Sequence, residues 1–171
     1  MGILNDLYDR VEAVGEGLKG EYIREVVSRH GEDIMDYQYQ QLFSGITSSG
    51  EDIRPYYSED IKPRGYFYST ESAGRYAAWK KDGISYPYVA NRNPDAPNLY
   101  INGRFHSELD VDFGPETVSV VGTTGYAKGI IDKYGTSTFG LTPEHWTAVF
   151  TERGAFEELF DIVRNTLYGI N

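Results

Sequence analysis

The sequence predicts an α+β fold in which a small antiparallel sheet packs against N- and C-terminal helices, with a long irregular arm between them. Apolar residues recur at helical spacing at both ends of the chain, they alternate with polar residues over residues 105–121, and no period survives over residues 45–98. We expect a single domain over residues 1–171. Its parts are a helical N-terminal part (1–44), an extended arm (45–98), a hairpin with a short helix (99–140) and C-terminal helices (141–171).

The N-terminal part begins with an apolar stripe at helical spacing over residues 3–27. Gly15, Gly17 and Gly20 interrupt it, and each glycine inside a helix costs about 0.5 to 1 kcal/mol relative to alanine. The alternatives are one kinked helix or two helices that meet near Glu16, and we favour a kinked helix that ends at residues 30–31. A second helix is predicted over residues 32–43, with Gly45 as its stop.

The segment 45–98 is rich in Gly, Pro, Ser and Tyr. A structureless loop of that length is rare inside a compact domain, and the segment is too aromatic to stay disordered. We therefore predict an extended arm that rests on its own core or on a neighbouring subunit. A short helix is predicted within it, over residues 71–80.

Alternation is strict from residue 105 to residue 113, which predicts a strand with one apolar and one polar face. The polar face comprises His106, Glu108, Asp110 and Asp112. Residues 114–116 have turn chemistry, and residues 117–121 resume the alternation, so the two strands form an antiparallel hairpin. A short helix follows over residues 126–134, and Gly135 is expected to end it in the left-handed conformation.

The C-terminal helices begin at Thr142, a good N-cap residue, followed by Pro143 at the first helical position. Gly154 is a possible break. The apolar seam of this part comprises Trp146, Val149, Phe150, Phe156, Leu159, Phe160, Val163 and Leu167. It is expected to pack on a core made of Phe105, Leu109, Val111, Val118, Val120, Ile130 and Ile131.

The amino-acid composition of the chain excludes several kinds of function and favours one. The chain has no cysteine, which excludes a thiol nucleophile, a thiolate metal site and a disulfide scaffold. The N-terminus lacks a basic region, and neither a signal peptide nor a membrane span is predicted. A net charge of −10 opposes binding to nucleic acid phosphates, so direct nucleic-acid readout is not expected. The 15 tyrosines favour contacts with other proteins.

Three stretches in fixed order resemble the tail-completion, or virion-morphogenesis, proteins of long-tailed bacteriophages and prophages, which are neck components that join head to tail. They are GITSSGEDIRPYYS at 45–58, NLYINGRFHSELD at 98–110, and a strand, Tyr-Ala, short helix and Phe-Gly pattern at 118–141. Two positions depart from the family's pattern. Asn102 stands where threonine is commoner, and Gly140-Leu141 replaces an Arg-Pro-Phe-Leu run.

The resemblance implies a structural virion protein that forms a homo-oligomeric ring between head connector and tail. Its expected partners are other copies of itself and virion proteins such as the head connector, the tail terminator or the tail tube. It implies localisation in the neck or tail of the virion, after assembly in the cytoplasm of the bacterial host. No catalytic residue, metal site or cofactor carries over, so an enzyme is not expected.

Two sets of residues are candidates for a subunit or partner interface. The arm contributes Ile53, Arg54, Tyr56, Tyr57, Tyr66 and Tyr68, and the strand region contributes Arg104, His106, Glu108, Asp110 and Asp112. Two alternatives remain open: a small hydrolase or metal-binding protein that uses the strand face from His106 to Asp112, and a monomeric protein-binding adaptor. Successive residues on one strand face are about 6.6 Å apart, so these four side chains cannot all reach one ion.

Overall fold

The computed structural model describes residues 3–59, 67–82, 87–114, 117–123 and 125–169. Within these ranges it confirms the predicted α+β class. The helices are α1 (Ile3–Leu18), α2 (Glu21–Arg29), α3 (Gly31–Ser44), α4 (Thr70–Lys81), α5 (Gly125–Tyr134), α6 (Pro143–Thr151) and α7 (Ala155–Tyr168). The strands β1 (Leu109–Phe113) and β2 (Val118–Gly122) form an antiparallel pair. None of the helices in these ranges has the length and apolarity that crossing a bilayer requires.

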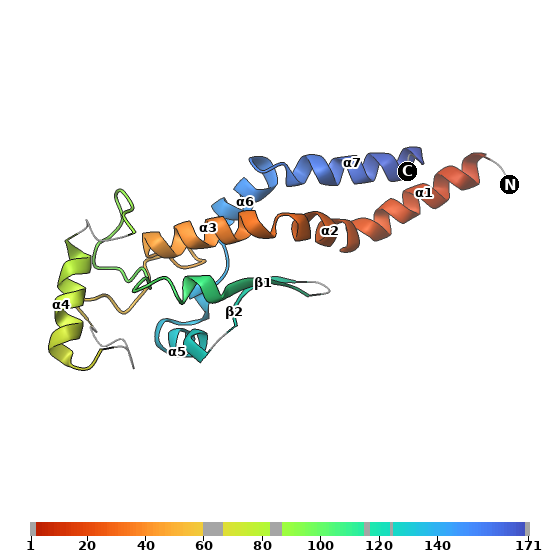
Figure 1. Cartoon of the computed structure of the whole chain (residues 1–171). Helices are drawn as coiled ribbons and strands as arrows, with labels where there is room; N and C mark the ends of the chain where they lie inside the picture. Colours follow the sequence, from red (N-terminus) through yellow and green to blue (C-terminus); the bar gives the residue numbers. More distant parts are fainter. Residues whose placement is uncertain (1–2, 60–66, 83–86, 115–116, 124, 170–171) are drawn as a thin grey trace.

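The molecule is elongated (Figure 1). Helices α1, α2 and α3 follow one another along its length, the hairpin and α5 lie on one side of α3, and α4 lies at the end far from both termini. Helix α7 runs beside α1 and α2 in the opposite direction, as three contacts show. These are Arg10 Nη1 to the Leu167 carbonyl oxygen (3.3 Å), the hydroxyls of Tyr22 and Thr166 (3.2 Å), and Arg29 Nη1 to Glu158 Oε2 (3.3 Å).

The N-terminal stripe forms two helices, so the favoured single kinked helix was wrong and the two-helix alternative is correct. The break lies at Lys19 and Gly20, a few residues after the expected position. Gly17 lies under the Tyr22 ring, and a Cβ atom at position 17 would overlap that ring. Helix α3 was predicted correctly, and Gly45 ends it in the left-handed conformation (φ 77°, ψ 32°).

The core lies between α3, the hairpin, α6 and the start of α7. Its fully buried members include Ile34, Leu42 and Val149. Most of the predicted core is confirmed: Phe105, Leu109 and Val120 are buried, and Val111, Val118 and Ile130 pack against them. Ile131 was placed wrongly, since it is 36% exposed, and so were Phe156 and Phe160, which are each 60% exposed.

The predicted strand over residues 105–113 is correct only from Leu109 onward. Residues 106–108 form a short 3₁₀ turn instead. The side chain of Asn102 accepts a hydrogen bond from the Arg104 amide (3.1 Å), and the Ser107 amide donates to the Gly103 carbonyl (3.0 Å). These local bonds satisfy the backbone in a turn, which removes it from a sheet ladder.

The signals at the remaining helix ends are confirmed in part. The Thr142 side chain caps α6 by accepting from the His145 amide (3.2 Å), and Gly154 separates α6 from α7 in the left-handed conformation. Gly135 follows α5 as expected, but its conformation (φ 88°, ψ 163°) is not the left-handed helical one that we predicted.

The described parts of the segment 45–98 rest on their own domain, which is the first of the two alternatives for the arm. The Ser48 amide donates to the Ser137 carbonyl (2.7 Å), the Ile53 amide to the Gly45 carbonyl (2.7 Å) and the Tyr57 amide to the Asp95 carbonyl (2.9 Å). Ile53 and Ala96 are fully buried. The predicted short helix is present as α4, whose N-terminus is closed by a capping box between Ser69 and Ser72.

Candidate functional site: an exposed helical face and a pocket

His106 does not lie on the polar strand face where the alternation placed it. It is 5% exposed, and its ring lies in an aromatic cluster with Tyr39, Phe43, Tyr100 and Phe105. Neither ring nitrogen has a hydrogen-bond partner within the described residues. Burial, with a smaller effect from the Lys80 charge, lowers the pKa of His106 to about 4. The side chain is therefore a neutral part of the interior.

The other strand residues are not gathered into one site. The Glu108 carboxylate pairs with Arg104 Nε at 3.0 Å, at the edge of the 3₁₀ turn. Asp110 and Asp112 remain as the exposed side of β1. Within the described ranges no group of three or more His, Asp or Glu side chains could hold a metal ion. The residues proposed for a hydrolase or metal-binding face are thus not brought together.

The arm residues divide into buried and exposed members. Ile53 and Tyr57 are buried within their own chain, so they were wrong as interface residues. Arg54 lies over the Tyr56 ring and pairs with Glu59 at 3.1 Å on the surface. Tyr68 is fully exposed. Tyr66 lies outside the described residues.

Several large apolar side chains are exposed on the helical pair of α1 and α7, and sequence reasoning missed this surface. We call it the α1–α7 face, and it comprises Leu7, Tyr8, Val11 and Leu18 of α1 with Phe156 and Phe160 of α7. Each of these side chains is between 39% and 67% exposed. The periodicity identified them as apolar sides of helices, and Phe156 and Phe160 were assigned to a seam that packs on the core. The spacing gives no signal of whether another part of the chain covers such a side.

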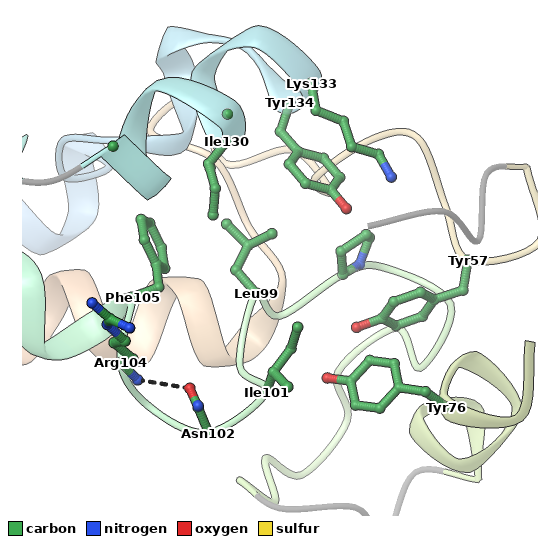
Figure 2. Close-up of a pocket in the computed structure, with 13 residues that line it drawn as sticks. Tyr57, Tyr76, Leu99, Ile101, Asn102, Arg104, Phe105, Ile130, Lys133 and Tyr134 are labelled. Atoms are coloured by element: carbon green, nitrogen blue, oxygen red, sulfur yellow. Dashed lines mark hydrogen bonds between the residues drawn. The ribbon is translucent and has the colours of Figure 1, made fainter. Parts of the chain in front are cut away.

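A pocket of about 340 Å³ lies between the chain before β1 and α5 (Figure 2). Its apolar lining includes Leu99, Ile101 and Ile130. The hydroxyls of Tyr57 and Tyr76 lie at one end of it. Burial raises the pKa of the Tyr76 hydroxyl, which donates a hydrogen bond to the Tyr100 carbonyl, so this group stays protonated. The pocket can accept a small apolar or aromatic group that has one polar end.

Lys80 fixes α4 to the body at one side of that pocket. Its side chain is fully buried, and its ammonium lies 5.1 to 5.6 Å from the ring centres of Tyr76, Trp79 and Tyr100. Burial, with a smaller effect from Arg92, lowers the pKa of Lys80 to about 8. The aromatic faces compensate part of the cost of burying the cation.

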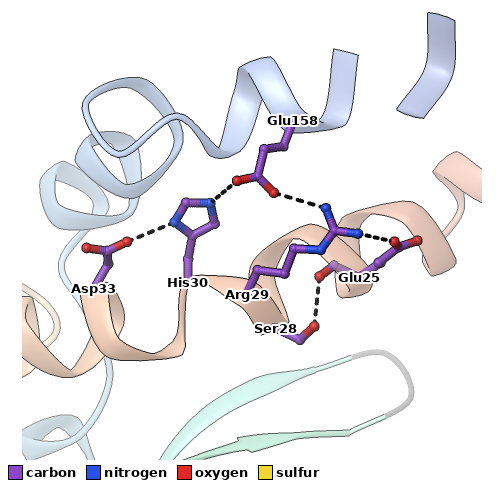
Figure 3. Close-up of polar contacts among 6 residues, drawn as sticks. All are labelled: Glu25, Ser28, Arg29, His30, Asp33 and Glu158. Carbon is purple, nitrogen blue, oxygen red and sulfur yellow. Dashed lines mark hydrogen bonds and ion pairs between the residues drawn. The ribbon is translucent and has the colours of Figure 1, made fainter. Parts of the chain in front are cut away.

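A polar junction joins α7 to the corner between α2 and α3 (Figure 3). His30 forms this corner, and its imidazole lies between Asp33 Oδ2 (2.9 Å from Nδ1) and Glu158 Oε1 (3.4 Å from Nε2). Arg29 contacts both Glu158 and Glu25. The same Glu158 carboxylate therefore holds two neighbouring residues of the corner, and this fixes where α7 begins to run beside α2.

Comparisons of the chain with protein-family models, with curated proteins and with solved structures found no match.

Proposed function

We propose that this protein is a structural component of a bacteriophage or prophage virion, in the neck or at the point of tail completion. It assembles into a homo-oligomeric ring between head connector and tail and has no catalytic role. The resemblance of the stretches at 45–58, 98–110 and 118–141 supports the position in the virion. The α1–α7 face supports the assembly role.

The single observation that carries the proposal is this exposed face. Contiguous apolar surface on a soluble protein marks an interaction site when it exceeds a few hundred Å². Phe156, Phe160 and Tyr8 supply large aromatic area at low entropic cost, and aromatic residues dominate the binding energy of protein interfaces. An assembly subunit needs such a surface, and a pocket enzyme does not.

The arrangement of the molecule is also suited to assembly. The helical pair extends away from the core, and α4 lies at the other end of the molecule (Figure 1). A subunit of this shape offers separate surfaces to two neighbours, one at the helical pair and one at the end with α4. The exposed carboxylates of Asp110 and Asp112 lie on the hairpin between these two ends, where a basic neighbour would fix register more than affinity.

The test is removal of the gene from the phage or prophage that carries it. We expect filled heads and separate tails by negative-stain microscopy, with joined particles restored by a plasmid copy. Mass spectrometry of purified wild-type particles should detect the chain in a fixed ratio to the connector protein. Normal joined particles without this chain would overturn the proposal.

The pocket supports a second candidate, in which the protein binds a small amphipathic ligand or a side chain of a virion neighbour. Its volume of about 340 Å³ lies within the range of ligand sites. A bulky substitution on its wall, Gly129→Trp, should block it, because a Cβ atom at this position meets nothing within 4 Å. A fragment screen by thermal shift, with wild type and Gly129→Trp in parallel, tests this candidate. The candidate would be rejected if the screen found no fragment whose binding is lost in Gly129→Trp.

A further inference from the structure

The exposed apolar residues of α1 and of α7 are rotated in the same sense from the residues by which each helix contacts its antiparallel neighbours. In α1, Arg10 faces α7, because it bonds the Leu167 carbonyl, and Val14, one turn further along the same side, is buried. Successive residues of a helix are about 100° apart around its axis. The exposed residues therefore lie about 40° to 140° from the direction midway between Arg10 and Val14, in the sense of increasing residue number; they are Leu7, Leu18, Val11 and Tyr8. In α7, Thr166 faces α2, and Phe156 and Phe160 lie about 80° to 120° round from Thr166 in that same sense.

Because the helices run antiparallel, rotations in the same sense place both stripes on one side of the helices. When two helices run in opposite directions, a clockwise step on one and a clockwise step on the other, each viewed along its own axis, point to the same side of the pair. The two stripes therefore lie on one side of these helices. The stripe of α7 lies level with α2, where Glu158 contacts Arg29, and the stripe of α1 continues from the end of α7, where Leu167 contacts Arg10. The helical pair is a two-helix layer with one apolar face exposed.

We propose that the occupant of the α1–α7 face is the same face of a second copy, so that two helical pairs form an antiparallel four-helix bundle. A layer of two antiparallel helices with one apolar face is half of such a bundle, and a second copy supplies the other half with equal length and spacing. Gly15 lies on this face with nothing within 4 Å of its Cβ position, which leaves room for a close approach. This inference deepens the proposed function and rests on it for the biological use of the pairing.

The area is sufficient for a specific contact. The exposed parts of the six side chains total roughly 500 Å² per copy, so pairing would bury on the order of 1,000 Å², which is what a specific interface needs.

The charges beside the face permit self-association. The apolar stripe of α1 is bordered by Glu12 and Lys19, and that of α7 by Glu157 and Arg164. Each stripe therefore has both an acidic and a basic residue at its edge. Opposite charges can therefore meet across a two-fold contact. The net charge of −10 on each copy opposes approach at long range, so moderate salt should strengthen the pairing.

The experiment is sedimentation velocity of the full chain from micromolar to near-millimolar concentration, at low and moderate salt. Three proteins are compared: wild type, Phe160→Glu on the face, and Tyr68→Glu as a matched control on an exposed aromatic residue away from it. We expect wild type and Tyr68→Glu to dimerise alike. Phe160→Glu should weaken the dimer by about 30-fold or more, because a charge would be buried within an apolar contact. Circular dichroism confirms that all three are folded.

A mixing experiment tests whether the two copies contribute the same face. Phe160→Glu and Phe160→Lys are each expected to remain monomeric, and their mixture should recover part of the dimer because opposite charges then meet across the contact. A wild type that is monomeric at every concentration would overturn the inference. So would a Phe160→Glu variant that dimerises as well as the Tyr68→Glu control, or a mixture that recovers nothing. A monomeric wild type that is nevertheless present in purified particles would overturn the pairing and leave the proposed function standing.

Discussion

The body of the molecule, which contains α3, the hairpin, α5 and α6, and the helical pair of α1 and α7 have the same kind of sequence pattern. Their apolar residues nevertheless lie in different environments. In the body, apolar residues at helical spacing, such as Ile34 and Leu42 of α3 and Val149 of α6, are fully buried. In the helical pair, Val11 of α1 and Phe160 of α7 remain more than half exposed. Periodicity thus identifies an apolar face, but it does not reveal whether the same chain covers that face.

The polar contacts of the two regions differ in the same way. In the body, the buried side chain of Gln41 accepts from the Thr142 amide (2.9 Å) and donates to the Gly140 carbonyl (2.8 Å), while buried Gln38 accepts from the Gly140 amide (2.8 Å). Helix α7 is held to α1 by the bond from Arg10 to the Leu167 carbonyl (3.3 Å) and to α2 by the half-exposed ion pair of Arg29 with Glu158. Exposed ion pairs contribute about 0 to 1 kcal/mol each. We conclude that the body is a stable unit and that the pair depends more on a partner.

The largest expected effect is a cavity in the body. Leu42→Ala should lower the free energy of unfolding by about 2 to 5 kcal/mol, because Leu42 is fully buried in the core. Leu7→Ala removes the same atoms from the helical pair, where Leu7 is 51% exposed, and should change it by about 0.5 kcal/mol in the monomer. Urea denaturation at low protein concentration measures both. Equal losses would remove the distinction between the two regions.

Acid should destabilise the body through His106. Its pKa is about 4 in the folded chain and about 6.5 when unfolded, so the unfolded state binds more protons between these values. The contribution of neutral His106 to the free energy of unfolding is fully present above pH 6.5. It is lost as the pH falls toward 4, and the loss reaches about 3 kcal/mol. His106→Phe should flatten this part of the stability profile in urea titrations at several pH values. An unchanged slope in that variant would show that other groups cause the acid sensitivity.

A smaller loss is expected when the buried amide of α3 is removed. Gln41→Ala leaves the Thr142 amide and the Gly140 carbonyl without this partner, at a cost of about 1 to 3 kcal/mol. The adjacent Gln40 is exposed, so Gln40→Ala is the matched control and should be nearly neutral. Thermal unfolding of the two variants gives the comparison. A Gln41→Ala variant as stable as Gln40→Ala would mean that water replaces the amide at no cost.

The smallest effect concerns the polar junction between α7 and the corner at His30. Glu158→Gln should cost about 1 kcal/mol or less, because the Glu158 side chain is 39% exposed and its ion pairs are screened. Its effect should be local: faster amide exchange in α7, with α3 unchanged. Glu157→Gln, at the neighbouring exposed position, serves as control. Faster exchange throughout the chain would contradict a local role.

Local signals allowed most element boundaries to be predicted. Gly45 required a positive φ after α3, and Thr142 with Pro143 marked the start of α6 through capping chemistry that involves only neighbouring residues. The features that were missed depend on distant residues. His106 is buried because Tyr39 and Phe43, more than sixty positions earlier, cover it, and alternation alone cannot distinguish that arrangement from a strand face.

The candidate site was the least predictable part for the same reason. Ile53 and Tyr57 were expected at an interface as members of the arm, but both side chains are buried within their own chain, and their amides bond the carbonyls of Gly45 and Asp95 in the same segment. The α7 part of the α1–α7 face was expected to pack on the core because its spacing is regular. A sequence specifies which side of a helix is apolar, and the three-dimensional packing decides which of those sides remain for a partner.

Amide hydrogen exchange of the wild-type chain, measured over a range of protein concentrations, tests most directly whether the helical pair depends on a partner. We predict that protection in α1 and α7 rises with concentration while protection in α3 stays constant, because pairing covers the α1–α7 face and leaves the body as it was. Protection in α1 and α7 that equals that of α3 and does not change with concentration would contradict this account.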